Sequence, residues 1–195
     1  MGMKYMRNLK EQFSKTPTFS IRDVELFFSQ QGLKPPYARQ MLHQMVRRQH
    51  VHRITPGTYT FHPEMQIAGN AFQPYYYGLQ DALSQHSLWD QETNPVIITP
   101  RKVRTGLRQF LGNNYLVRRI DRKLFFGYEL MPYADFWIYV SDVEKTLIDF
   151  AYFKEPLDAQ TLEEIKKRLE PKKLVTYLEK CPAWLRQRVN RRIRK

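Results

Sequence analysis

Residues 19–61 read FSIRDVELFFSQQGLKPPYARQMLHQMVRRQHVHRITPGTYTF, and this stretch decides the fold of the first part of the chain. Ser20 with Asp23 three positions later is a variant capping box that starts a helix, and Gly32 is a helix stop signal. A second, basic helix follows, and then a two-stranded hairpin with Pro56-Gly57 at its tip. Helix, turn, helix and hairpin in this order predict a winged helix-turn-helix, a fold that lays its second helix in the major groove of DNA.

The second helix is expected to have one apolar and one polar face. Pro35 and Pro36 fit its first turn, where a missing N–H costs little. The apolar face, at the spacing of a 3.6-residue period, carries Ala38, Leu42, Met45 and Val46. The opposite face carries Tyr37, Arg39, Gln40, His43, Gln44 and Arg47.

That polar face has the residue types that base readout requires. Arg can grip a guanine edge with two donors and Gln can do the same to adenine. Tyr37, His43 and the helix N-terminus are candidates for phosphate or base-edge contacts; the alternative is a basic face that is only solvated. With the hairpin included, the predicted DNA-binding residues are Lys34, Tyr37, Arg39, Gln40, His43, Gln44, Arg47, Arg48, Arg53, Thr55 and Thr58.

The hairpin is the predicted wing, with strands over residues 51–55 and 58–61. Alternation along the first strand assigns Val51, Arg53 and Thr55 to one face and His52 and Ile54 to the other. Arg53, Thr55 and Thr58 lie close to the tip, where a wing meets backbone phosphate. An ordinary hairpin that only closes the domain is the alternative, and both interpretations can hold together.

The chain has 195 residues and a net charge of +13, and the positive charge is concentrated at both ends. Residues 1–63 hold 10 Lys and Arg against 3 Asp and Glu, residues 64–162 hold 10 against 12, and residues 163–195 hold 12 against 4. Charge spread in this way favours a polyanion partner over a small acidic substrate. A single cysteine, no signal peptide and no membrane-spanning stretch fit a reducing, cytoplasmic setting.

The first domain is predicted to cover 1–63, a linker 64–74 and a second domain 75–195. A helix is expected from Pro74 through Tyr75, Tyr76, Tyr77, Leu79, Ala82 and Leu83, with the tyrosines packed in the core rather than serving as a base-stacking platform. Strands are expected at 95–99, 115–120, 123–128 and 136–140, with the middle two paired. Residues 100–111 are compatible with strand, loop or helix.

Helices follow these strands. Ser141 with Glu144 matches a full capping box for a helix over 142–153. Asp158, Pro171 and Pro182 stand where further helices can begin. Strands followed by helices indicate an α+β second domain with a helical C-terminal end.

Four segments of the chain, in this order and spacing, carry a family resemblance. They are the stretch ending in Pro56-Gly-Thr-Tyr59, then Tyr76-Tyr-Gly-Leu-Gln-Asp-Ala-Leu83, Leu124-Phe-Phe-Gly-Tyr128 and Val140-Ser-Asp-Val-Glu-Lys-Thr-Leu-Ile-Asp149. On these segments the chain resembles the AbiE-type (AbiEi-like) antitoxin family, winged-helix transcriptional repressors of type IV toxin–antitoxin and abortive-infection systems. The resemblance covers about residues 19–153 and does not include the basic tail.

The resemblance implies a winged-helix domain fused to an α+β antitoxin domain, in a protein that represses its own operon at inverted repeats in double-stranded DNA. It also implies a functional partner, a nucleotidyltransferase-like toxin encoded beside it, which such antitoxins oppose without a stable complex. The DNA readers would be the recognition-helix and wing residues named above, and residues 141–149 would belong to the antitoxin domain. A homodimer on DNA and several monomers at one site both remain open.

Catalytic and metal chemistry find little support in the sequence. Glu144 and Asp149 are five residues apart, which places them off a common helix face and is poor geometry for paired acid–base work. His50 and His52 share a strand face, but no cysteine or carboxylate lies near them in the sequence to complete a metal site. We therefore expect no enzymatic activity, no cofactor and no bound metal.

The C-terminal run RQRVNRRIRK, residues 186–195, is a second candidate for polyanion contact. It could hold phosphate or RNA, or act as a flexible DNA arm, and the alternative is a solvated helix end whose cations suit the helix dipole. An RNA-binding protein that uses this tail is accordingly the alternative function.

Overall fold

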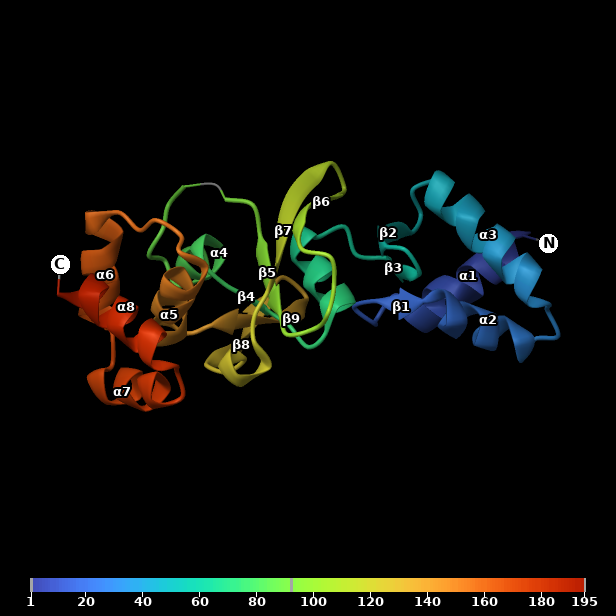
Figure 1. Cartoon of the computed structure of the whole chain (residues 1–195). Helices are drawn as coiled ribbons and strands as arrows, with labels where there is room; N and C mark the ends of the chain where they lie inside the picture. The colour runs from blue at the N-terminus through green and yellow to red at the C-terminus, as the bar shows by residue number, and fades with distance from the viewer. Residues whose placement is uncertain (1, 92, 195) are drawn as a thin grey trace. The chain divides into compact units, whose positions relative to one another are not determined.

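A computed structural model describes residues 2–91 and 93–194 of the chain. The fold is mixed α+β, with helices and two β-sheets (Figure 1), which confirms the predicted class. The chain divides into two compact units. One holds the residues up to Ala71 together with Gln109–Asn113, and the other holds Phe72–Arg108 together with the residues from Asn114 onward.

The first unit combines three helices with a small antiparallel sheet. Its α-helices are α1 (Gly2–Phe13), α2 (Ile21–Ser29) and α3 (Pro35–Arg47). Its strands are β1 (Phe19–Ser20), β2 (His52–Thr55) and β3 (Thr58–Thr60), in the order β1-β3-β2, and a 3-10 helix, η1 (Met65–Phe72), follows.

An apolar core joins the three α-helices of this unit to its sheet. Leu9 of α1, Phe28 of α2 and Leu42 of α3 are buried in it, together with Phe19 of β1. The rings of Phe13 and Phe19 stack at 4.9 Å, so α1 is tied to the sheet as well as to the helices. This packing fixes which face of α3 is left to solvent.

A six-stranded mixed sheet forms the centre of the second unit. Its strands are β4 (Tyr76–Tyr77), β5 (Val96–Thr99), β6 (Gly106–Phe110), β7 (Asn113–Arg119), β8 (Tyr128–Tyr133) and β9 (Phe136–Ser141). The order is β6-β7-β5-β4-β9-β8; the pairs β4–β9 and β5–β7 are parallel, and β4–β5 and β8–β9 are antiparallel.

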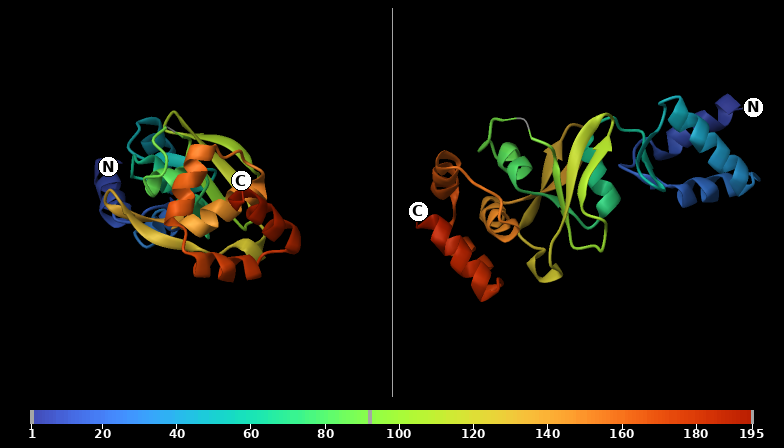
Figure 2. Two further views of the ribbon diagram at one scale, coloured as in Figure 1. Left: turned by 90° about the vertical axis from the view of Figure 1, so that its left-hand side faces the viewer. Right: turned by 45° about the horizontal axis from the view of Figure 1, so that its top comes forward.

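Helices pack around α5 and against this sheet (Figures 1 and 2). They are α4 (Gln80–Gln85), the 3-10 helix η2 (Arg122–Leu124), α5 (Val143–Phe153), α6 (Ala159–Arg168), α7 (Pro171–Glu179) and α8 (Ala183–Ile193). Tyr76 and Ile98 from the sheet, Leu147 from α5 and Leu185 from α8 are fully buried in one cluster. The C-terminal helices therefore belong to the core of the unit.

Tyr76 and Tyr77 form strand β4 and Tyr75 directly precedes it, so the helix predicted from Pro74 through Leu83 is wrong for these residues; helix α4 begins only at Gln80. Tyr75, Tyr76 and Tyr77 are all buried to at least 99%, and β4 is a central strand paired on both sides. Their predicted place in the core is confirmed. Buried rings cannot stack on bases from solvent.

The predicted strand at 123–128 is also wrong, and so is its pairing with 115–120. Asp121 accepts a hydrogen bond from the backbone N–H of Lys123 at 2.8 Å and caps η2 instead. Gly127 has φ +70°, which breaks an extended chain, and β8 begins only at Tyr128. Strand β7 instead pairs with β5 and β6, and β6 lies within the stretch 100–111, which is compatible with several conformations from sequence alone.

Helix α5 begins at Val143, one residue later than predicted. Asp142, not Ser141, is the N-cap and accepts the backbone N–H of Lys145 at 2.8 Å. Ser141 belongs to β9, and its hydroxyl shares a hydrogen bond with Thr146. Glu144 accepts the backbone N–H of Glu170 at 2.7 Å, so it fixes the start of α7 and does not cap its own helix.

The remaining helix starts agree with prediction. Asp158 is the N-cap of α6, Pro171 is the first residue of α7, and Pro182 is the N-cap of α8. The basic C-terminal run is helical through Ile193, and Val189 is fully buried. The flexible-arm interpretation is therefore wrong for the residues up to Arg194.

Candidate nucleic-acid interface

The capping box predicted for α2 is present, with both of its reciprocal hydrogen bonds formed. Ser20 Oγ accepts the backbone N–H of Asp23 at 3.2 Å, and Asp23 Oδ2 accepts the backbone N–H of Ser20 at 2.6 Å. Because Ser20 also pairs with Thr58 in the sheet, one residue connects the start of α2 to the hairpin. This link sets the position of the hairpin relative to the helices of the unit.

Helix α3 buries one face and exposes the other, as its periodicity predicts. The buried residues are Ala38, Met41, Leu42 and Met45. Val46 was expected in this set but is only half-buried, and Met41 was not expected but is buried. The core face therefore lies slightly further toward Met41 than predicted, and the solvent face is centred on Gln40, His43 and Arg47.

Eight of the predicted DNA-binding residues are exposed, and all are polar or charged. They are Lys34, Arg39, Gln40, His43, Gln44, Arg47, Arg48 and Arg53. Tyr37, Thr55 and Thr58 are half-buried. The ring of Tyr37 packs edge-on against Tyr5 of α1 at 6.0 Å, so Tyr37 helps to hold α3 on α1.

The backbone at the N-terminus of α3 offers no donor to a phosphate, contrary to the expectation for this helix end. Pro35 and Pro36 have no N–H. The N–H groups of Tyr37 and Ala38 both donate to the carbonyl oxygen of Lys34, at 3.0 and 3.4 Å. Contacts from this end of the helix must therefore come from side chains.

One residue of the polar face is already engaged within the unit. Arg39 Nε donates to Glu25 Oε1 of α2 at 2.5 Å, although the Arg39 side chain is 67% exposed and that of Glu25 is 19% exposed. The bond uses Nε, which leaves the two Nη groups at the exposed end of the side chain. Glu25 was not among the predicted site residues, because a pair 14 positions apart depends on how two helices cross.

The hairpin presents one arginine and two threonines near a tight turn. Gly57 has φ +84°, a conformation that side-chain-bearing residues rarely adopt, and Thr55 pairs with Thr58 across the turn. The register is irregular between Arg53 and Thr55. Ile54 is buried and Arg53 is exposed, as the predicted opposite faces require, but the assignment of Val51 to the face of Arg53 is wrong, because Val51 is buried and precedes β2.

The electrostatic character of this surface follows from an acid-free stretch of sequence. Residues 26–63 contain no Asp or Glu and five Lys and Arg. All five cations, Lys34, Arg39, Arg47, Arg48 and Arg53, are exposed. The exposed residues of this stretch therefore carry net positive charge, and Gln40, His43 and Gln44 add exposed hydrogen-bonding groups.

The segments that carry the family resemblance in the second unit come together around a buried ion pair. Lys145 pairs with Asp149 one helical turn away, both side chains are fully buried, and Tyr76 donates to Asp149 Oδ2 at 2.9 Å. The ring of Tyr76 stacks on Tyr128 at 5.4 Å. Tyr76, Lys145 and Asp149 lie in the core, out of reach of solvent, whereas Tyr128 is half-buried.

Burial raises the pKa of Asp149, and the charge of Lys145 opposes that rise. Replacing one partner of such a pair leaves a buried charge uncompensated. Through the hydrogen bond from Tyr76, this pair on α5 is also connected to β4. Within residues 2–91 and 93–194, no three His, Cys, Asp or Glu side chains cluster in a way that could hold a metal ion.

Comparison with known proteins assigns no family: no protein-family model matches the chain, and no curated protein matches it. None of the helices in the described residues is long and apolar enough to cross a membrane.

Proposed function

We propose that this chain is a sequence-specific DNA-binding transcriptional repressor and the antitoxin of a type IV toxin–antitoxin system, acting in the cytoplasm on its own operon. In this proposal the first unit is a winged helix-turn-helix, α3 is its recognition helix and the β2–β3 hairpin is its wing. The observation that carries the proposal is the exposed face of α3. It presents Gln40, Gln44 and Arg47 to solvent, in a stretch of sequence without acidic residues.

The side chains divide into two roles. Gln40, Gln44 and Arg47 project from the middle and end of α3 and would read base edges in the major groove, at about 1–3 kcal/mol of discrimination for each good bidentate pair. Arg48 and Arg53 lie beyond the end of α3 and on the hairpin, where they would bind backbone phosphate without reading sequence. Since each phosphate neutralised contributes about −0.9 to the slope of log K against log salt, binding is strongly salt-dependent.

The Arg39–Glu25 pair adds a built-in restraint to this mechanism. Glu25 holds Arg39 Nε and brings a negative charge to the edge of the interface. Binding to DNA would either keep this pair, with Nη1 and Nη2 directed to a guanine, or break it. In both cases removal of the Glu25 charge favours DNA.

Binding to the DNA upstream of the chain's own gene, against scrambled DNA of equal length at about 0.15 M salt, tests the repressor role. The triple variant Arg39→Ala, Gln40→Ala, Gln44→Ala should lose the preference for the upstream DNA. Arg7→Ala is the matched control, because Arg7 is an exposed arginine on α1. Equal binding of both DNAs by the unchanged chain would refute sequence-specific recognition.

The antitoxin role is tested separately with the full chain and the nucleotidyltransferase-like toxin expected beside it. Co-expression should restore growth, and the triple variant should still do so while it no longer represses the promoter. Sedimentation of the chain with DNA carrying one or two inverted repeats distinguishes a homodimer from independent monomers. Failure of the unchanged chain to restore growth would remove the antitoxin role and leave a repressor.

A further inference from the structure

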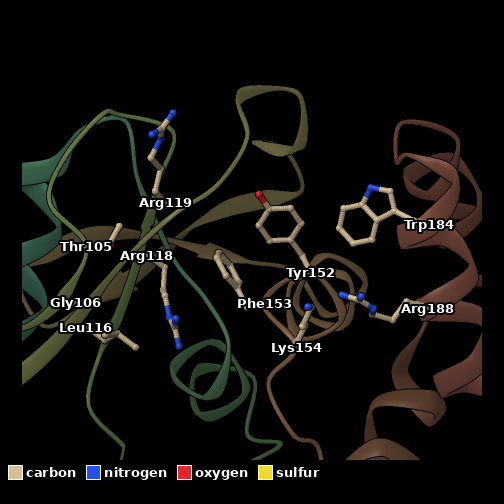
Figure 3. A pocket seen from close by; sticks show the side chains of 10 residues that line it. All are labelled: Thr105, Gly106, Leu116, Arg118, Arg119, Tyr152, Phe153, Lys154, Trp184 and Arg188. Atoms are coloured by element: carbon tan, nitrogen blue, oxygen red, sulfur yellow. The ribbon is translucent and has the colours of Figure 1, made fainter.

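A hollow of about 570 Å³ in the second unit is lined by cations and aromatic rings (Figure 3). The cations are Arg118, Arg119, Lys154 and Arg188, and the rings are Tyr152, Phe153 and Trp184. They come from β7, from the C-terminal end of α5 and from α8. Among the described residues that line the hollow, none is acidic.

The aromatic side of the hollow is open to solvent. Trp184 is 47% exposed, whereas its neighbour Leu185 is fully buried, so Trp184 lies on the outward face of α8. Its ring lies 6.0 Å from that of Tyr152, with an angle of 33° between the two planes. Figure 3 shows Trp184 and Arg188 reaching from α8 toward Tyr152 and Lys154.

Arg188 is fixed beside this tryptophan. Its Nη1 donates to the carbonyl oxygen of Ala151 at 3.0 Å, and its guanidinium carbon lies 5.1 Å from the centre of the Trp184 ring. A guanidinium held against a ring in this way keeps its remaining donors in place for an anion. Ring and cation are thus arranged before any ligand arrives.

The positive charge of the hollow is only partly neutralised by neighbouring groups. Glu155 pairs with Arg118, whose guanidinium also lies over Phe153 at 5.7 Å. The Glu155 carbonyl oxygen accepts Arg192 Nη2 at 2.6 Å. Burial, followed by the charge of Arg188, lowers the pKa of Arg192, as expected where cations are crowded together.

Lys154 occupies a backbone conformation that suits glycine. It ends α5 with φ +60° and ψ +28°, in the left-handed region, where a residue with a Cβ costs energy. The side chain is exposed and lines the hollow (Figure 3). A function for the amine would account for lysine at this position.

We propose that this hollow binds an unpaired stretch of nucleic acid, with a base stacked on Trp184 and the backbone phosphates held by Lys154 and Arg188. The bases of a duplex are stacked on one another inside the helix, and a duplex offers mainly phosphates to a protein surface. Its bases are therefore not free to stack on an exposed protein ring. Single strands splay their bases and stack them on aromatic side chains. This site is independent of the proposed operator binding, because its residues belong to the other unit.

The test measures fluorescence anisotropy of labelled oligouridylate, oligothymidylate and a blunt DNA duplex, each of about ten nucleotides or base pairs, with the full chain at about 0.15 M salt. We expect both single strands to bind more tightly than a random duplex. A preference for oligouridylate would identify RNA as the ligand, and equal binding would identify single strands in general. Tighter binding of the duplex would overturn the proposal.

Matched variants separate stacking from general charge. Trp184→Ala should weaken single-strand binding roughly five- to hundredfold, and Trp184→Phe should retain most of it. Trp137→Ala is the control, because Trp137 is an exposed tryptophan on β9 outside the hollow. Unchanged binding by Trp184→Ala, or an equal loss in Trp137→Ala, would overturn the proposal.

The phosphate contact has its own variants. Lys154→Gln should lower the slope of log K against log salt by about 0.7, the value for one phosphate of a single strand. Lys172→Gln, which removes an exposed lysine of α7, should leave the slope unchanged. The α3 triple variant should bind single strands as the unchanged chain does; a loss there would place single-strand binding on α3 and refute the site.

Discussion

Replacing Asp81 by asparagine should change how the stability of the second unit depends on pH. Asp81 is 4% exposed on α4, and its Oδ2 has no hydrogen-bond partner among the described residues. Burial raises the pKa of this carboxyl from 3.8 to about 7, although hydrogen bonds with Gln85 and the Val96 backbone oppose the rise. The folded chain therefore keeps a proton that the unfolded chain releases.

The sign and the size of the pH effect on stability follow from the difference between the folded and unfolded pKa values of Asp81. Between pH 4 and 7, roughly the two pKa values, the folded state binds more protons, so the free energy of unfolding falls by about 1.4 kcal/mol for each pH unit. The stability contributed by protonated Asp81 is fully present below the unfolded pKa and is lost once pH passes the folded one. From pH 5 to pH 8 the loss is about 3 kcal/mol. Because asparagine cannot ionise, the Asp81→Asn variant should not lose this stability.

Urea unfolding followed by tryptophan fluorescence measures this effect selectively, because Trp89, Trp137 and Trp184 all lie in the second unit. The stability of Asp81→Asn relative to the unchanged chain should rise by about 3 kcal/mol between pH 5 and pH 8. Asp90→Asn, at an exposed position, should show no such rise. Parallel pH profiles for the Asp81→Asn variant and the unchanged chain would show that Asp81 is ionised in the folded state.

Three further substitutions probe the two units. Glu25→Gln should raise affinity for the operator several-fold in anisotropy titrations and change the free energy of unfolding by less than about 1 kcal/mol, because its pair with Arg39 is on the surface. Lys145→Met should cost about 3–5 kcal/mol in urea unfolding, because Asp149 is left buried and unpaired, and a second change, Asp149→Leu, should recover much of the loss. Gly127→Ala should cost at least about 1–2 kcal/mol in the same assay, because φ is +70° and the new Cβ would lie 2.9 Å from the Cβ of Lys145.

The sequence predicted the first unit better than the second for a physical reason. In the first unit the elements have one buried face and local end signals, such as the Ser20–Asp23 capping box or the prolines that start α3. The spacing of apolar residues along the sequence therefore indicates the structure. The central strand of the second unit is buried on both faces. Tyr75-Tyr76-Tyr77 consequently shows no alternation, and a helix and a strand are indistinguishable from such a run.

Long-range contacts account for what the sequence could not predict at the candidate sites. The Arg39–Glu25 pair depends on the crossing of two helices. The hollow around Trp184 draws its residues from three separate elements, and Lys154 and Arg188 lie 34 positions apart in the chain. Clusters of this kind carry no local spacing pattern, so they become visible only once the chain is folded.

The left-handed conformation of Lys154 has a consequence for molecular evolution. Glycine at this position would relieve backbone strain of about 1 kcal/mol, so a library selected only for heat resistance should become enriched in glycine there. A library selected for retention of the nucleic-acid ligand should instead keep lysine. The residue retained at position 154 would show whether selection has acted on the stability of the fold or on ligand binding in the hollow.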